Sequence, residues 1–196
     1  MSVDTEHNDI DGEARRLWEF ALALYEVEAV KQACLSIQAR YGLSISLLLG
    51  AIWAGANGYG RLGATELETA IRRGVEWHRE IIEPLRALRR RLRQLPPQGL
   101  ERRTERLRHR LLEQELEAER IEQRLFLEDF PPGRPAAPLA ERWRDAAANA
   151  ALLTRKSCPQ PEPQALEALS HILQTTFPEV AAAGLAREAE AVWRIG

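Results

Sequence analysis

The residues that most often carry catalytic or metal chemistry are sparse in this chain and poorly spaced for it. The four histidines are His7, His78, His109 and His171. None belongs to an H-E-x-x-H or E-x-x-H sequence, the spacings that place metal ligands on one helix face. No G-x-S-x-G or glycine-rich phosphate motif occurs, and the two cysteines, Cys34 and Cys158, form neither a disulfide framework nor a zinc spacing. We therefore expect no metal and no cofactor.

One acidic group invites a metal-binding interpretation. Glu76, Glu80 and Glu83 lie at positions i, i+4 and i+7, so three carboxylates could share one face of a helix. However, Arg72 and Arg79 precede Glu76 and Glu83 by four residues, a spacing that favours ordinary ion pairs on a wet surface.

Arginine position is more informative. The chain has 25 arginines but only two lysines, and ten of the arginines lie between residues 86 and 110, against two glutamates. That segment carries a net charge of +8, and the rest of the chain carries −10. A concentrated basic segment on an acidic body is the electrostatic footprint of an anionic partner. Guanidinium groups also pair bidentately with phosphate or carboxylate.

Apolar spacing around these arginines predicts an antiparallel helical hairpin over residues 66–128, with its turn at Pro96–Gly99. Two heptad seams support it: Leu85, Leu88, Leu92 and Leu95 on the first arm, then Leu107, Leu111, Gln114, Ala118, Ile121 and Leu125 on the second. Pro84 lacks an N–H and predicts a kink or restart near Ile82–Pro84.

The hairpin contains the candidate partner-binding site. We predict one exposed basic surface, with no aromatic residue to stack on a base, made of Arg86, Arg89, Arg90, Arg93, Arg103, Arg106 and Arg110. Two other interpretations stay open: a charge run on a coiled coil is usually only its solvated face, and some arginines could pair with acidic residues of Glu113–Glu122.

The fold is predicted to be all-α, with a compact body around Ser44–Asn57. This stretch is apolar on every face, but its uninterrupted apolar run is only ten residues long, whereas a membrane span needs about 20. We expect a buried central helix capped by Ser44, with Trp53 almost wholly buried. Gly50 and Gly55 should let neighbouring helices approach closely.

The remaining chain divides at cap and turn signals. We expect a helix from Asp11, another over Val27–Tyr41, and a capping box in which Thr65 and Glu68 start the helix that leads to the hairpin. The predicted divisions are a disordered segment at 1–10, a helical core domain at 11–130, a linker at 131–137 and a C-terminal helical extension at 138–196. With no secretory signal or membrane segment evident, we expect a cytoplasmic protein; a homodimer is left open.

Several segments together resemble a known family. They read LWEFALALY from Leu17, ACLSIQ from Ala33, LLL from Leu47 with Trp53, and PLRALRR from Pro84. This LWxFAxxLY…ACLxxQ…LLL…W…PLRxxRR pattern resembles an uncharacterised proteobacterial family, a domain of unknown function, over residues 14–128. The resemblance implies a cytoplasmic bacterial helical protein and transfers no activity.

The leading interpretation is a non-catalytic interaction or adaptor protein that uses the basic hairpin as its contact surface. The alternative is an RNA- or ribosome-binding protein that uses the same arginines. A small-molecule-binding or enzymatic helical domain ranks third. Salt separates the first two, because binding to phosphates weakens steeply as the salt concentration rises.

Overall fold

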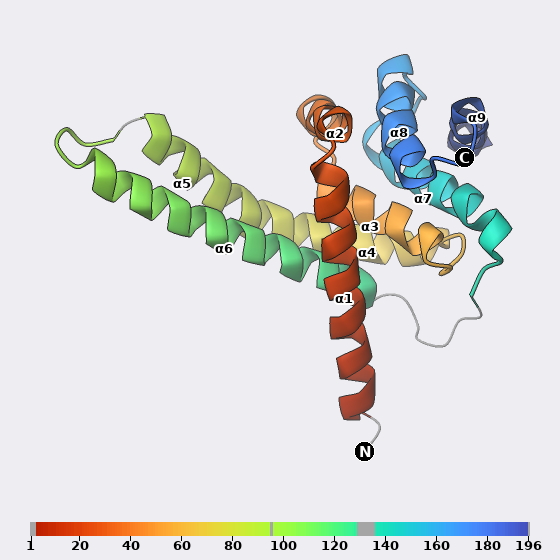
Figure 1. The fold of residues 1–196 in the computed structure, drawn as a ribbon, viewed down its shortest axis with the longest axis horizontal. Coiled ribbons are helices and arrows are strands. Elements are labelled where there is room, and N and C mark those ends of the chain that lie inside the picture. Colours follow the sequence, from red (N-terminus) through yellow and green to blue (C-terminus); the bar gives the residue numbers. More distant parts are fainter. Residues whose placement is uncertain (1–2, 95, 129–135, 196) are drawn as a thin grey trace.

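Helix follows helix along the described chain, as the all-α prediction requires (Figure 1). The computed structural model describes residues 3–94, 96–128 and 136–195, and it contains no strand within them. No helix among these residues is both long and apolar enough to cross a membrane. The elements are α1 (Val3–Tyr25), α2 (Glu28–Tyr41), α3 (Ile45–Ala56), α4 (Ala64–Trp77), the π-helical turn η1 (His78–Ile82), α5 (Glu83–Gln94), α6 (Glu101–Glu128), the 3₁₀ turn η2 (Leu139–Glu141), α7 (Arg142–Ser157), α8 (Pro163–Thr176) and α9 (Ala182–Ile195).

The central helix α3 is buried and capped as predicted. The Ser44 hydroxyl accepts a hydrogen bond from the backbone N–H of Leu47 at 3.4 Å, which satisfies one of the free donors at the helix start. Trp53 is 2% exposed, and its ring lies 5.4 Å from that of Tyr59, centroid to centroid.

Two glycines of α3 bring other helices into direct contact with it. A Cβ at Gly55 would lie 2.2 Å from the backbone nitrogen of Ala146 in α7, and one at Gly50 would lie 2.9 Å from the ring of Phe126 in α6. Any side chain would hold these helices apart, so both glycines do what the sequence predicts.

The C-terminal helices pack on this body, a point that the sequence left open. Asn149 of α7 is fully buried. Its side-chain amide donates to the carbonyls of Ala51 (3.3 Å) and Gly60 (3.1 Å) and accepts from the N–H of Leu62 (2.8 Å). One side chain thereby ties α7 to α3 and to the loop that follows α3.

The predicted start of the first helix is wrong. α1 begins at Val3 rather than Asp11, so helix covers residues 3–10, which were predicted to be disordered. Residues 1 and 2 lie outside the described residues, as do residues 131–135 of the predicted linker.

The predicted capping box is also wrong. α4 begins at Ala64, and the carboxylate of Glu66 accepts a hydrogen bond from the N–H of Gly63 at 2.8 Å. Glu66 therefore reaches back across the first turn and satisfies a backbone donor that the helix leaves free. Thr65 and Glu68 lie inside the helix rather than at its start.

α5 and α6 form the predicted antiparallel hairpin, which projects from the body (Figure 1). Gly99 in its turn has φ +80°, a left-handed conformation that suits glycine. Upstream, the N–H of Glu83 bonds to the carbonyl of His78, five residues back rather than four. Because Pro84 has no N–H to donate, the interruption predicted there takes the form of a π-helical turn.

Candidate functional site

The inward face of the hairpin differs from the one that the leucines predict. On α6, Glu115 and Glu122 are buried, whereas Leu107 and Ile121 of the predicted seam are 42% and 38% exposed. On α5, Leu88 is 48% exposed. The helices are therefore rotated so that carboxylates take inward positions on α6, while several seam residues turn toward solvent.

Arginines of α5 lie opposite those carboxylates. Arg86 donates to Glu115 at 3.0 Å, to Glu119 at 2.5 Å and to Glu83 at 3.3 Å. Arg89 donates to both carboxylate oxygens of Glu115, at 2.6 and 3.2 Å. The side chains of Arg86 and Glu115 are only 17% and 5% exposed. In such a network each charge depends on its partner, because removal of one leaves the other buried and uncompensated.

The network continues into the π-helical turn through His78. Nδ1 of His78 lies 3.1 Å from Oε1 of Glu122, which also accepts from the Ser44 hydroxyl at 3.2 Å. Nε2 lies 3.4 Å from a carboxylate oxygen of Glu83. Burial lowers the pKa of His78, but the hydrogen bond and charge of Glu122 outweigh it, and the pKa is raised on balance. Protonated His78 thus compensates a carboxylate that has no exposed surface.

The seven predicted surface arginines divide into three groups. The prediction is wrong for Arg86 and Arg89, which Glu115 and its neighbours draw into the buried network. Arg90 is 59% exposed and contacts Glu83 at 3.4 Å. The four that are exposed beyond this network are Arg93, Arg103, Arg106 and Arg110.

We call residues 91–94 and 96–110 the distal hairpin. Arg108 in it pairs with Glu105 at 2.5 Å. Two of its leucines, Leu100 and Leu107, are 47% and 42% exposed. Within the part of the chain that the structure describes, six of its arginines form neither an ion pair nor a side-chain hydrogen bond: Arg91, Arg93, Arg102, Arg103, Arg106 and Arg110.

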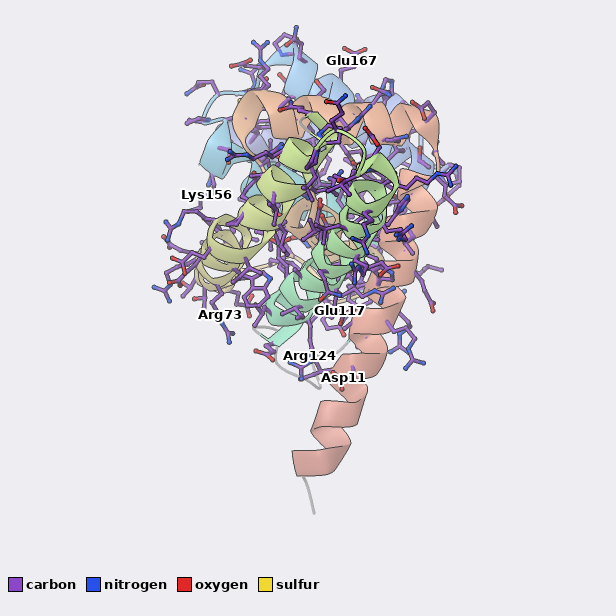
Figure 2. The ribbon with its side chains drawn as sticks, turned by 90° about the vertical axis from the view of Figure 1, so that its left-hand side faces the viewer. Asp11, Arg73, Glu117, Arg124, Lys156 and Glu167 are labelled. Carbon is purple, nitrogen blue, oxygen red and sulfur yellow. The ribbon has the colours of Figure 1, made fainter. Side chains whose placement is uncertain are left out.

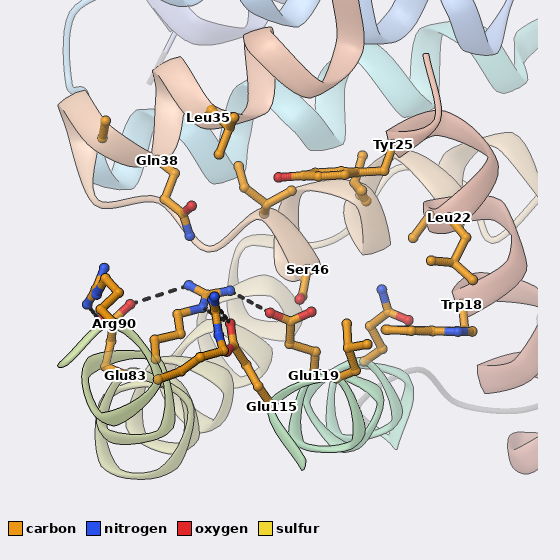
Figure 3. A pocket seen from close by; sticks show the side chains of 18 residues that line it. Trp18, Leu22, Tyr25, Leu35, Gln38, Ser46, Glu83, Arg90, Glu115 and Glu119 are labelled. Carbon is orange, nitrogen blue, oxygen red and sulfur yellow. Dashed lines mark hydrogen bonds and ion pairs between the residues drawn. The ribbon is translucent and has the colours of Figure 1, made fainter. Parts of the chain in front are cut away.

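A groove of about 710 Å³ lies at the base of the hairpin, and the sequence did not predict it (Figure 3). α1, α2 and α3 line one side, mainly with apolar residues that include Trp18, Leu22, Tyr25, Leu35, Ile45 and Leu49. α5 and α6 line the other side with the charged residues Glu83, Arg86, Arg89, Arg90, Glu115 and Glu119. An apolar wall thus faces the partly buried ion-pair network.

The three glutamates that suggested a metal site have different surroundings. Glu83 contacts Arg86, whereas Glu80 is exposed and pairs with Arg79 at 2.9 Å. Arg79 therefore does not make the ion pair with Glu83 that the spacing favours. Among the described residues, no group of three or more His, Cys, Asp or Glu side chains is arranged to hold a metal ion.

The groove and the hairpin lie in a region that other proteins share. A family model described as "Protein of unknown function (DUF2390)" matches residues 16–126. The chain belongs to the DUF2390 family. This confirms the resemblance to an uncharacterised family. Every residue that lines the groove, from Trp18 to Gln123, is inside the DUF2390 region, and α7, α8 and α9 are outside it. Neither the curated proteins nor the solved structures gave a match.

A sequence signal for the buried network does exist. Glu115, Glu119 and Glu122 step by four and three residues, as an apolar seam does, and Arg86 and Arg89 stand three apart on the facing arm. The interpretation that some arginines pair with acidic residues of Glu113–Glu122 is therefore confirmed for Arg86 and Arg89, and the heptad spacing of charges on both arms is its signal. The groove has no comparable signal, because its walls come from five helices.

Proposed function

We propose that the protein is a non-catalytic interaction protein whose distal hairpin binds an acidic, partly apolar segment of a partner protein. The observation that supports this most is the mixture, on a projecting element, of exposed leucines and of arginines that pair with no other described residue. Each arginine can form charge-assisted hydrogen bonds with a partner's carboxylates without first breaking a bond inside its own chain.

Spacing places the two residue types on the same surface. On the second arm, four residues of these two types are separated by three, four and three positions: Leu100, Arg103, Leu107 and Arg110. This spacing places them along one face of the helix. On the first arm, Leu88 and Arg91 are three residues apart in the same way. An acidic amphipathic helix offers matching apolar and anionic stripes.

A protein partner fits this surface better than RNA. No Phe, Trp or Tyr lies between residues 83 and 112, so the hairpin lacks the stacking platforms that single-stranded nucleic acids use. Contact with a charged phosphate backbone buries little apolar surface of the half-exposed leucines. Contact with apolar residues of a protein partner buries that surface and stabilises the complex. Binding of RNA by the arginines alone is the outcome that the following experiment must distinguish.

The test is capture of a partner from lysate by the tagged full-length chain, with and without nuclease, followed by binding of the purified partner. Charge reversal of Arg91, Arg103, Arg106 and Arg110 to Glu is expected to abolish binding. Because exposed substitutions usually change stability by about 0.5 kcal/mol or less each, folding should survive. Leu100→Ser with Leu107→Ser, both exposed in the distal hairpin, should weaken binding to a protein while leaving the arginines in place.

A matched control makes the same change in charge elsewhere. Four exposed arginines lie outside the α5–α6 hairpin: Arg15, Arg72, Arg79 and Arg187. Changing all four to Glu should leave binding intact. Equal loss in both sets would show a general charge effect and contradict the proposal. Capture that nuclease abolishes, that falls steeply with salt and that ignores the leucine changes would assign RNA as the partner.

A further inference from the structure

We propose that the groove at the base of the hairpin is a binding site for a small amphipathic carboxylate, a molecule with an apolar body and one anionic head. This site is separate from the distal hairpin, and the proposal does not depend on what the hairpin binds. It rests on the shape of the groove, on its apolar wall and on the polar groups that converge on it without partners.

The size and composition of the groove suit a small ligand. Its volume of about 710 Å³ falls within the range of about 300–1,000 Å³ that is usual for ligand pockets. Leu22 and Leu35 line it and are 46% and 40% exposed, and Leu116 lines it from α6 at 36% exposure. An apolar ligand body would cover leucine surface that the fold leaves in contact with water.

Three polar side chains from three different helices converge on this space. Figure 3 shows Tyr25, Gln38 and Ser46 directed into the groove from α1, α2 and α3. Each can donate a hydrogen bond, yet none has a side-chain hydrogen bond to any described residue. On the opposite side, Arg90 is 59% exposed and is held by Glu83 through a single 3.4 Å contact.

A deeper polar atom in the same groove is also unsatisfied. Gln123 is 2% exposed, and its Oε1 has no hydrogen-bond partner among the described residues. Buried polar atoms are nearly always paired. Because Oε1 is an acceptor, it needs a donor such as a water molecule, and a carboxylate head cannot pair with it directly. The groove is thus incomplete as the folded chain leaves it.

The remaining donors favour an anionic head over a cationic one. The carboxylates in the groove are already engaged: Glu115 accepts from two arginines, Glu119 accepts from Arg86, and Glu83 contacts Arg86 and Arg90. The groups that are free or weakly held are hydroxyls, an amide and a guanidinium. A carboxylate can accept from several such donors at once, whereas an ammonium group would compete with arginine for the same glutamates.

Titration calorimetry with decanoate, below its micelle concentration, tests the proposal on the full-length chain. Decanol and decyltrimethylammonium keep the same tail with a neutral or a cationic head, and 2-naphthoate replaces the tail by a ring. We expect decanoate or 2-naphthoate to bind more tightly than the neutral and cationic analogues. The preferred carboxylate shows whether the natural ligand is aliphatic or aromatic. If neither binds, or the ammonium binds as well, the proposal is overturned.

Variants then locate the site. Arg90→Gln removes the weakly held cation and should weaken carboxylate binding about tenfold, the usual worth of a charge-assisted hydrogen bond. Its matched control, Arg79→Gln, changes an exposed arginine that also pairs with one glutamate but does not line the groove, and should alter affinity less than twofold, as a change without contact does.

Tyr25→Phe keeps the ring and removes one donor, so it should weaken binding even if Arg90→Gln folds poorly. Equal losses for Arg90→Gln and Arg79→Gln, or no loss for Tyr25→Phe, would overturn the site while leaving the distal-hairpin proposal untouched.

Discussion

The proximal and distal parts of the hairpin are rich in the same residue, arginine, but surround it differently. Near the body, Arg86 and Arg89 are partly buried and held by Glu115. Toward the turn, Arg103 and Arg106 are exposed and without an internal partner among the described residues. The difference follows from α6, which supplies glutamates to its second half and arginines to its first. Arginine density therefore does not define a binding surface; what lies opposite each arginine does.

Burial by the body accentuates this contrast. α1 crosses the proximal part of α6, where Arg124 donates to Asp11 at 2.7 Å (Figure 2). In the same part, Arg120 lies over the ring of Trp18, 4.7 Å from its centroid. The side chains of Arg86 and Glu115 in this part are mostly shielded from water, so their ion pair is less screened and each charge needs its partner more. No helix crosses the distal hairpin in Figure 1.

The largest expected effect comes from removal of the acceptor that two proximal arginines share. Glu115→Ala leaves the guanidiniums of Arg86 and Arg89 short of a carboxylate in a mostly buried position, and loss of one partner from a buried ion pair costs about 3–5 kcal/mol. Urea denaturation measures this loss. Glu113→Ala, an exposed change on the same helix, should cost about 0.5 kcal/mol or less. Similar losses for both variants would mean that the network does not stabilise the fold.

A smaller effect should depend on pH. Because folding raises the pKa of His78, the protonated ring stabilises the folded protein fully below its ordinary value of about 6.5. This stabilisation is lost as the pH rises through the higher pKa of the folded state. His78→Gln removes it, so the gap in unfolding free energy between wild type and variant should narrow from pH ~6 to pH ~9. A difference in unfolding free energy between wild type and variant that stays constant or grows as the pH rises would contradict the assigned pairing of His78 with Glu122.

The sequence predicted the architecture better than the site. The α3 helix, its glycine contacts and the turn at Pro96–Gly99 follow from local signals: an all-round apolar run, small residues, and a proline-glycine break. The rotation of the hairpin did not follow, because the heptad rule assumes that leucines fill the seam. Here the glutamates of α6 carry the same spacing, and their arginine partners lie on another helix.

The groove could not be predicted for a different reason. Its polar groups, such as Tyr25, Gln38 and Arg90, form no recognisable motif within their own helices. They come together only because α1, α2 and α5 are packed around one space. Nothing in local spacing encodes that placement. The arginine prediction failed only in part, since Arg103 and Arg106 are exposed as expected while Arg86 is not.

The smallest expected effect is also the most direct test of the contrast between the two parts of the hairpin. Arg106→Ala should change the free energy of unfolding in urea by about 0.5 kcal/mol or less, whereas Arg86→Ala, measured side by side, should cost about 3–5 kcal/mol because it leaves Glu115 and Glu119 without their shared cation. A large loss at Arg106, or equal losses at the two positions, would contradict the conclusion that the proximal arginines hold the fold and the distal ones are free for a partner.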